Sequence, residues 1–150
     1  MRQLRRFIGA ALLTLAALLL TFKFKAALGW SPDFLVPVLA AAGFLLDLVP
    51  LALLAILAAW VLNWQAGFPP ELWFVLAVPF AAWLGKRFLP SAPWLTLAAV
   101  VAAGELLFYG IADTVVFWPS FGFIFSNILF ATLFALTLQR LFAYIYGTPD

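Results

Sequence analysis

The 150-residue chain contains no cysteine and no histidine, and only 9% of its residues are charged. Without cysteine it forms no disulfide and has no thiolate to act as a nucleophile or an iron–sulfur ligand. Without histidine it lacks the commonest acid–base side chain and the ligands of a bis-histidine haem site. These absences exclude thiol enzymes, small cytochrome-type membrane anchors and the usual histidine-based mechanisms.

The remaining composition is that of a membrane protein. Apolar residues make up 67% of the chain, which excludes an ordinary soluble domain. The net charge of +2 comes from scattered lysines and arginines. They form no basic face that would follow a nucleic acid backbone. The sequence therefore predicts an all-α, polytopic integral membrane protein whose single transmembrane domain covers residues 1–150.

Groups able to carry out a reaction are also scarce. The six acidic residues are spread along the chain, and no two lie close enough in sequence to indicate a catalytic dyad. The few serines have no histidine to activate them. No glycine-rich phosphate loop and no metal-ligand spacing is present. We therefore expect no enzymatic activity, no cofactor and no metal site.

The number of membrane crossings depends on residues 34–63, which contain one charge, Asp47, followed by Pro50. As one straight helix this stretch would be about 45 Å long, whereas the hydrocarbon core of a bilayer is about 30 Å thick. The stretch is therefore either one steeply tilted span or two spans joined at Asp47. A turn is favoured because proline is best accommodated in the first turn of a helix.

The basic residues favour the turn as well, because they accumulate on the cytoplasmic side. With six spans, Lys86, Arg87 and Arg140 lie inside with the N-terminal arginines, and only Lys23 and Lys25 lie outside. With five spans, Lys86, Arg87 and Arg140 would lie outside instead. We predict a six-helix bundle with both termini cytoplasmic, and five spans with one long kinked helix is the alternative. The expected spans are residues 7–24, 31–47, 50–66, 72–86, 92–110 and 122–144, the first being uncleaved.

Glu105 is the polar residue that most needs an explanation. A carboxylate inside a span costs free energy unless it is paired, protonated or facing a cavity. Glu105 precedes the last outer loop by about as many residues as Asn127 follows it, so both lie roughly 9 Å below the outer surface. Adjacent antiparallel spans would place Glu105 beside Ser126 and Asn127. These residues form either a ligand- or partner-binding pocket or an interhelical hydrogen bond that fixes the packing.

Further candidate positions are Asp47 and two groups of small residues. Asp47 either caps the third helix or contacts a cytoplasmic partner. Ala40–Gly43 in the second span and Ala98–Gly104 in the fifth, which includes Ala99 and Ala103, allow close approach of another helix. We therefore expect Gly43, Ala99 and Ala103 to lie on surfaces that dock a second membrane protein.

Three short segments resemble a bacterial family. Pro32-Asp33-Phe34-Leu35 opens the second span, Gly43-Phe44-Leu45-Leu46-Asp47-Leu48 closes it, and Ser126-Asn127-Ile128-Leu129 begins the core of the last. This layout, after a short basic N-terminus and one span, is similar to that of MreD, the small six-span rod shape-determining membrane protein.

The resemblance implies a non-enzymatic scaffold of the cell-elongation machinery in the bacterial cytoplasmic membrane. Its implied partners are the single-span protein MreC and, through it, the RodA glycosyltransferase with its penicillin-binding transpeptidase, all within the lipid bilayer. The fold of that family is thought similar to the substrate-binding S-components of energy-coupling-factor transporters. A subunit that binds a small solute is therefore the alternative function.

Overall fold

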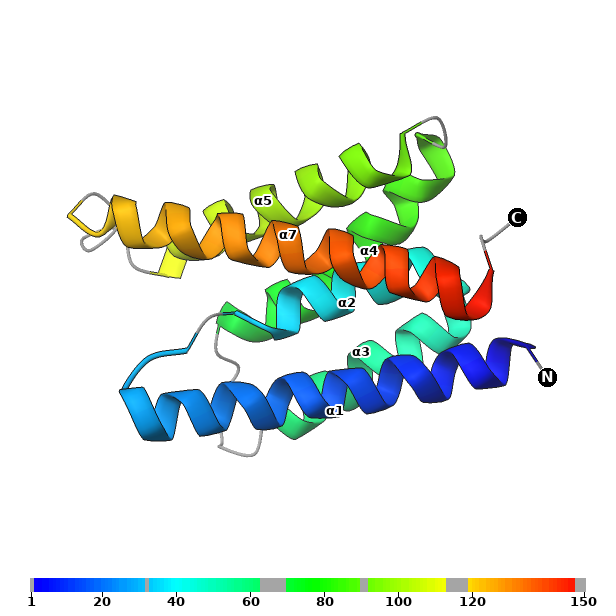
Figure 1. Ribbon diagram of the computed structural model, residues 1–150, viewed down its shortest axis with the longest axis horizontal. Helices are drawn as coiled ribbons and strands as arrows, with labels where there is room; N and C mark the ends of the chain where they lie inside the picture. Colours follow the sequence, from blue (N-terminus) through cyan, green and yellow to red (C-terminus); the bar gives the residue numbers. More distant parts are fainter. Residues whose placement is uncertain (1, 32, 63–69, 90–91, 113–118, 148–150) are drawn as a thin grey trace.

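The computed structural model describes residues 2–31, 33–62, 70–89, 92–112 and 119–147, and every regular element in them is a helix (Figure 1). The predicted all-α class is confirmed. The six helices are α1 (Arg2–Leu28), α2 (Leu35–Leu45), α3 (Leu48–Leu62), α4 (Pro70–Phe88), α5 (Pro93–Ala112) and α7 (Phe121–Tyr146).

The helical structure is interrupted between α2 and α3, at the turn that the sequence predicts at Asp47; we call this turn the corner. Leu46 has extended backbone angles, with φ −100° and ψ 155°, and α3 starts two residues later at Leu48. Pro50 then lies in the first turn of α3, where its ring meets no helical carbonyl. Figure 1 shows α2 and α3 running in opposite directions. The alternative of one long kinked helix over residues 34–63 is therefore wrong.

The second helix is much shorter than the predicted span of residues 31–47. It comprises only the 11 residues Leu35–Leu45. Pro37 explains the late start, because its ring would clash with the carbonyl of Asp33 in a helix that continued backwards. Asp33 instead accepts hydrogen bonds at its Oδ1 from the backbone N–H groups of Leu35 and Val36, at 2.9 and 3.1 Å.

The other end of α2 is closed by a charged side chain too. The ammonium group of Lys86, from the last turn of α4, donates a hydrogen bond to the carbonyl of Phe44 at 2.9 Å. An acid at the N-terminus and a base at the C-terminus both match the helix dipole. They also satisfy backbone groups that a short helix leaves without partners. These two contacts explain how so short a helix ends inside a bundle.

All 11 residues of α2 are buried, and α2 packs against α1, α4, α5 and α7. It is thus the central element around which the other helices are arranged. Figure 1 shows the two termini, the corner between α2 and α3, the end of α4 and the start of α5 at one end of the bundle. The other end holds the last turn of α1 and the start of α7.

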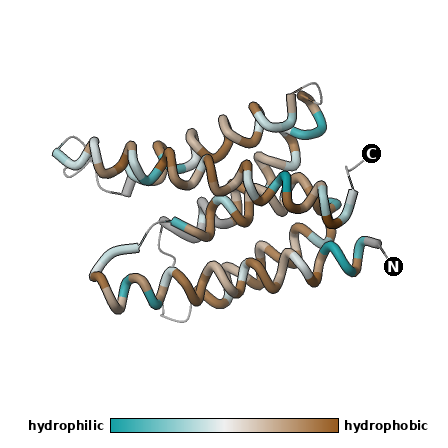
Figure 2. The backbone as a smooth tube through the Cα atoms, in the orientation of Figure 1, coloured by the Kyte–Doolittle hydropathy of each residue, from teal (hydrophilic) through white to brown (hydrophobic). Residues whose placement is uncertain are grey.

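Three of the described helices are long and apolar enough to cross a membrane: Gln3–Leu28, Pro93–Gly110 and Phe121–Tyr146. The outer surface of the bundle is rich in large apolar side chains, such as Leu12 and Val49, which are 62% and 69% exposed. In Figure 2, α1 is hydrophilic near its two ends and mostly hydrophobic between them. These are the properties of a helical membrane protein, because a soluble surface would not present such a continuous apolar face.

Candidate functional site

Glu105 lies in α5 and is completely buried, with 0% of its surface exposed. Neither of its carboxyl oxygens has a hydrogen-bond partner among the described residues. A buried polar group without a partner costs free energy and usually has a functional reason or an occupant. Glu105 is therefore the centre of the candidate site.

Asp33 approaches Glu105 from the connection between α1 and α2. Its carboxyl lies close enough to that of Glu105 for the two groups to interact electrostatically, while it also caps α2. Its backbone N–H donates a hydrogen bond to Oδ1 of Asn127 at 3.2 Å. Asp33 therefore links the start of α2 to both α5 and α7.

Asn127 and Tyr109 complete the group. Asn127 is 5% exposed and lies in α7, and its side-chain amide donates to the hydroxyl of Tyr109 in α5. Tyr109 is one turn beyond Glu105 on the same helix, and the two interact electrostatically. We call Asp33, Glu105, Tyr109 and Asn127 the polar cluster. It joins three helices that otherwise meet through apolar side chains.

The predicted neighbours of Glu105 are therefore found in part. Asn127 belongs to the same cluster, but its hydrogen bonds go to Tyr109 and Asp33 and none to Glu105. Ser126 is exposed and donates to the carbonyl of Gly122 in its own helix at 3.0 Å. Because successive helical residues point about 100° apart, only one of the two can face α5.

Asp47 is exposed at the corner between α2 and α3. Its carboxylate accepts a hydrogen bond from the side chain of Gln3 at 2.6 Å, which ties the start of α1 to this corner. Its backbone carbonyl accepts from the N–H of Leu51 at 3.0 Å, as the residue preceding a helix does. Asp47 thus stands at the cap position of α3, and contact with a cytoplasmic partner stays a prediction.

The two groups of small residues differ in location. Gly43 and its neighbours in α2 are buried against α4, and a Cβ on Gly43 would collide with the carbonyl oxygen of Pro79. This group is a packing face inside the protein, and none of it remains on the surface for a partner. Ala99 and Ala103 in α5 are exposed and line an open hollow of about 390 Å³ between α4 and α5.

The polar cluster offers carboxyl, amide and phenol groups at one point, which suits binding or helix locking. Among the described residues, no three metal-ligating acids gather at one place. Tyr109 was not singled out from the sequence, and Asp33 was noted only as part of the segment Pro32–Leu35, without a role in the site. Tyr109 follows Glu105 by four residues and so lies on the same face of the helix, a spacing from which its place in the cluster could have been predicted. The position of Asp33 depends on how α2 sits between α5 and α7.

Comparisons of this chain with models of known protein families, with curated proteins and with solved structures find no match. The function is therefore argued from the site and from the sequence.

Proposed function

We propose that the chain crosses the bacterial cytoplasmic membrane six times and acts as a non-enzymatic scaffold that binds the single transmembrane helix of another protein. Both termini are cytoplasmic in this proposal. The distribution of basic residues supports it, because Lys86, Arg87 and Arg140 then share the cytoplasmic end with the N-terminus. Non-helical backbone within a bilayer must be shielded by protein, and the two ends of the short helix α2 meet this requirement.

The observation that carries the proposal is the hollow between α4 and α5. On α4 it is lined by Ala77, Ala81 and Gly85, which recur every four residues and so lie on one face. On α5, Ala99 and Ala103 repeat the same spacing opposite them. Four of these five residues are exposed alanines, and the fifth is a half-buried glycine.

Such a surface suits a helix better than a lipid chain. Helices in a membrane associate through close van der Waals packing, and alanine and glycine allow the backbones to approach. The hollow runs along two helices and has small residues on both walls, so we infer that one additional helix packs along the groove that they form. The resemblance to MreD suggests that this helix belongs to an MreC-type single-span protein.

The proposal is tested by enlarging the two alanines of α5. We expect Ala99→Leu and Ala103→Leu each to abolish co-purification with the co-expressed MreC-type protein, because leucine fills the hollow. A photo-crosslinking residue at position 103 is expected to link to that protein's transmembrane helix. Ala16→Leu is the matched control, because Ala16 is an exposed alanine of α1 outside the hollow. Co-purification that survives both substitutions in α5 would refute the proposal.

The polar cluster favours one alternative, a subunit that binds a small solute for an energy-coupling-factor transporter. The specific observation is the buried Glu105 carboxyl without a hydrogen-bond partner among the described residues. A ligand with N–H or O–H groups would supply that partner. Native mass spectrometry of the purified protein distinguishes the two functions. A bound vitamin-like molecule that is lost in Glu105→Leu supports this alternative, and an empty protein in several preparations argues for the scaffold.

A further inference from the structure

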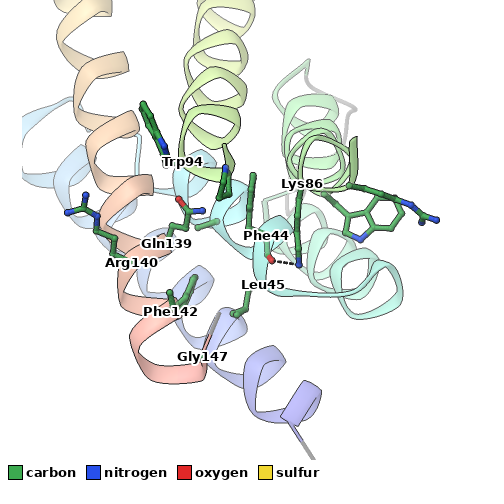
Figure 3. A pocket seen from close by; sticks show the side chains of 13 residues that line it. Phe44, Leu45, Lys86, Trp94, Gln139, Arg140, Phe142 and Gly147 are labelled. Atoms are coloured by element: carbon green, nitrogen blue, oxygen red, sulfur yellow. Dashed lines mark hydrogen bonds between the residues drawn. The ribbon is translucent and has the colours of Figure 1, made fainter. Parts of the chain in front are cut away.

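A second cavity lies at the end of the bundle that holds both termini. It has a volume of about 680 Å³, is open on one side and is lined mainly by residues of α2, α4, α5 and α7 (Figure 3). This volume is within the range of sites that bind small organic molecules. It shares none of its lining residues with the hollow between α4 and α5 or with the polar cluster.

Positive charge is concentrated at this cavity. Lys86, Arg87 and Arg140 line it, which are three of the eight basic residues of the whole chain. None of the described lining residues is acidic. Asp47 interacts electrostatically with Lys86, but it is not a lining residue and its carboxylate is bound by Gln3. The cavity therefore has an excess of positive charge and suits an anion.

The basic groups come from opposite walls and are partly fixed in place. Figure 3 shows Lys86 on α4 and Arg140 on α7, on either side of the space, with the Lys86 ammonium at the Phe44 carbonyl and the Arg140 guanidinium directed outward. The ammonium of Lys86 is positioned by its hydrogen bond to Phe44, which uses one of its three N–H groups. The guanidinium of Arg87 lies 5.6 Å from the centre of the Trp83 ring. Side chains that are held in this way lose less conformational freedom when they bind a phosphate.

The other lining residues indicate that the anion has an apolar part. Ala41, Leu45 and Phe142 supply apolar walls, and Trp94 stands near Gln139 at the side of the space (Figure 3). Tryptophan is enriched at the level of lipid headgroups because its ring is apolar and its N–H is polar. A free phosphate would gain nothing from these walls. A molecule with a charged head and an acyl chain would use both.

We propose that this cavity binds an anionic glycerophospholipid of the phosphatidylglycerol type, with its phosphate at the ammonium group of Lys86 and with Arg87 and Arg140 adding positive charge at the edges of the space. The first carbons of the acyl chains lie against the apolar walls. Basic pockets between transmembrane helices on the cytoplasmic side bind such headgroups in general. The inference rests on the proposed membrane arrangement, but it does not depend on the docking of a partner helix between α4 and α5.

The test is native mass spectrometry of the full-length protein released from nanodiscs that contain phosphatidylglycerol and phosphatidylcholine with identical acyl chains. We expect the wild-type protein to retain phosphatidylglycerol preferentially. Arg140→Gln and Lys86→Gln are each expected to weaken this retention by about fivefold, since each removes one basic group near the headgroup. Arg5→Gln is the matched control, because Arg5 is an exposed base of α1 that does not line the cavity.

A second variant fills the space without changing its charge. Ala143→Phe on α7 is expected to reduce retention of phosphatidylglycerol while the protein keeps its thermal stability. Equal retention of the two lipids by the wild-type protein would overturn the proposal. So would displacement of phosphatidylglycerol by inorganic phosphate at equal concentration, because the cavity would then be a site for a free anion. The Ala103→Leu variant is expected to retain phosphatidylglycerol as the wild-type protein does. The lipid proposal and the partner-helix proposal can therefore be refuted independently.

Discussion

Gly43 in α2 lies directly against the backbone of Pro79 in α4, with no space for a side chain between them. A Cβ on Gly43 would collide with the Pro79 carbonyl oxygen and would lie 2.9 Å from the Cβ of Ala82. Pro79 lies in the interior of α4 and its side chain is fully buried. The close approach of α2 to α4 at this point therefore depends on this glycine.

The first prediction concerns that contact. Gly43→Ala should lower the free energy of unfolding by about 1 to 3 kcal/mol, because backbone atoms cannot move aside as a flexible side chain can. Thermal unfolding in detergent, followed by circular dichroism, measures the change. Gly110→Ala in α5 is the control, because a Cβ there meets nothing within 4 Å. A helical glycine in open space should gain stability on this substitution, by about 0.5 to 1 kcal/mol.

The second prediction concerns the buried carboxyl of Glu105. Glu105→Leu should raise the free energy of unfolding by about 1 to 3 kcal/mol, because it removes a buried carboxyl that has no hydrogen-bond partner among the described residues and that faces the carboxyl of Asp33. Glu105→Gln keeps two polar atoms in the same place and should change stability much less. Both are measured by the same unfolding assay. A leucine variant that is less stable than the wild type would mean that Glu105 makes a stabilising polar contact.

The third prediction separates two adjacent residues of α7. Asn127→Ala should destabilise the protein by about 1 to 3 kcal/mol, because the N–H of Asp33 and the hydroxyl of Tyr109 both lose a partner. Ser126→Ala should have an effect below about 0.5 kcal/mol, because Ser126 is exposed and its hydroxyl donates to a carbonyl of its own helix. Equal effects of the two substitutions would contradict the assigned orientation of α7.

The fourth prediction concerns the start of α2. Asp33→Ala should cost about 0.5 to 2 kcal/mol, because the N–H groups of Leu35 and Val36 lose the side chain that accepts from them. Asp33→Asn retains an oxygen at that point and should recover most of the loss. Unfolding measured at one fixed pH compares the three proteins. If Asn were as damaging as Ala, the negative charge rather than the cap would be what stabilises α2.

The main features of the fold follow from a few residues of the sequence. Pro50 and Asp47 identify the corner between α2 and α3, because proline belongs in a first turn and a charge belongs outside the hydrocarbon. Pro93 likewise marks the first residue of α5. The short length of α2 was not predicted, although the ring of Pro37 prevents the helix from extending back to Asp33. Hydropathy alone extends a span as far as the apolar residues continue, whether or not the backbone is helical.

The candidate site is predicted less completely, for a different physical reason. Depth arithmetic brings Glu105 and Asn127 to one level, but it does not give the rotation of α5 and α7 about their axes. That rotation selects Asn127 over Ser126 and brings Tyr109 to it. Lys86, Arg87 and Arg140 are each placed at one end of the bundle by the sequence. The cavity between them arises only from the packing of α4 and α7 against α2 and α5.

The most direct test of the account is the accessibility of Phe88, which is 74% exposed at the end of α4. Because the chain has no cysteine, Phe88→Cys and Trp30→Cys each provide a single labelling site. With six crossings, a membrane-impermeant maleimide added to intact cells labels position 30 and leaves position 88 unlabelled until the membrane is opened. Labelling of position 88 from outside intact cells would contradict the six-crossing arrangement and the cytoplasmic location of the termini.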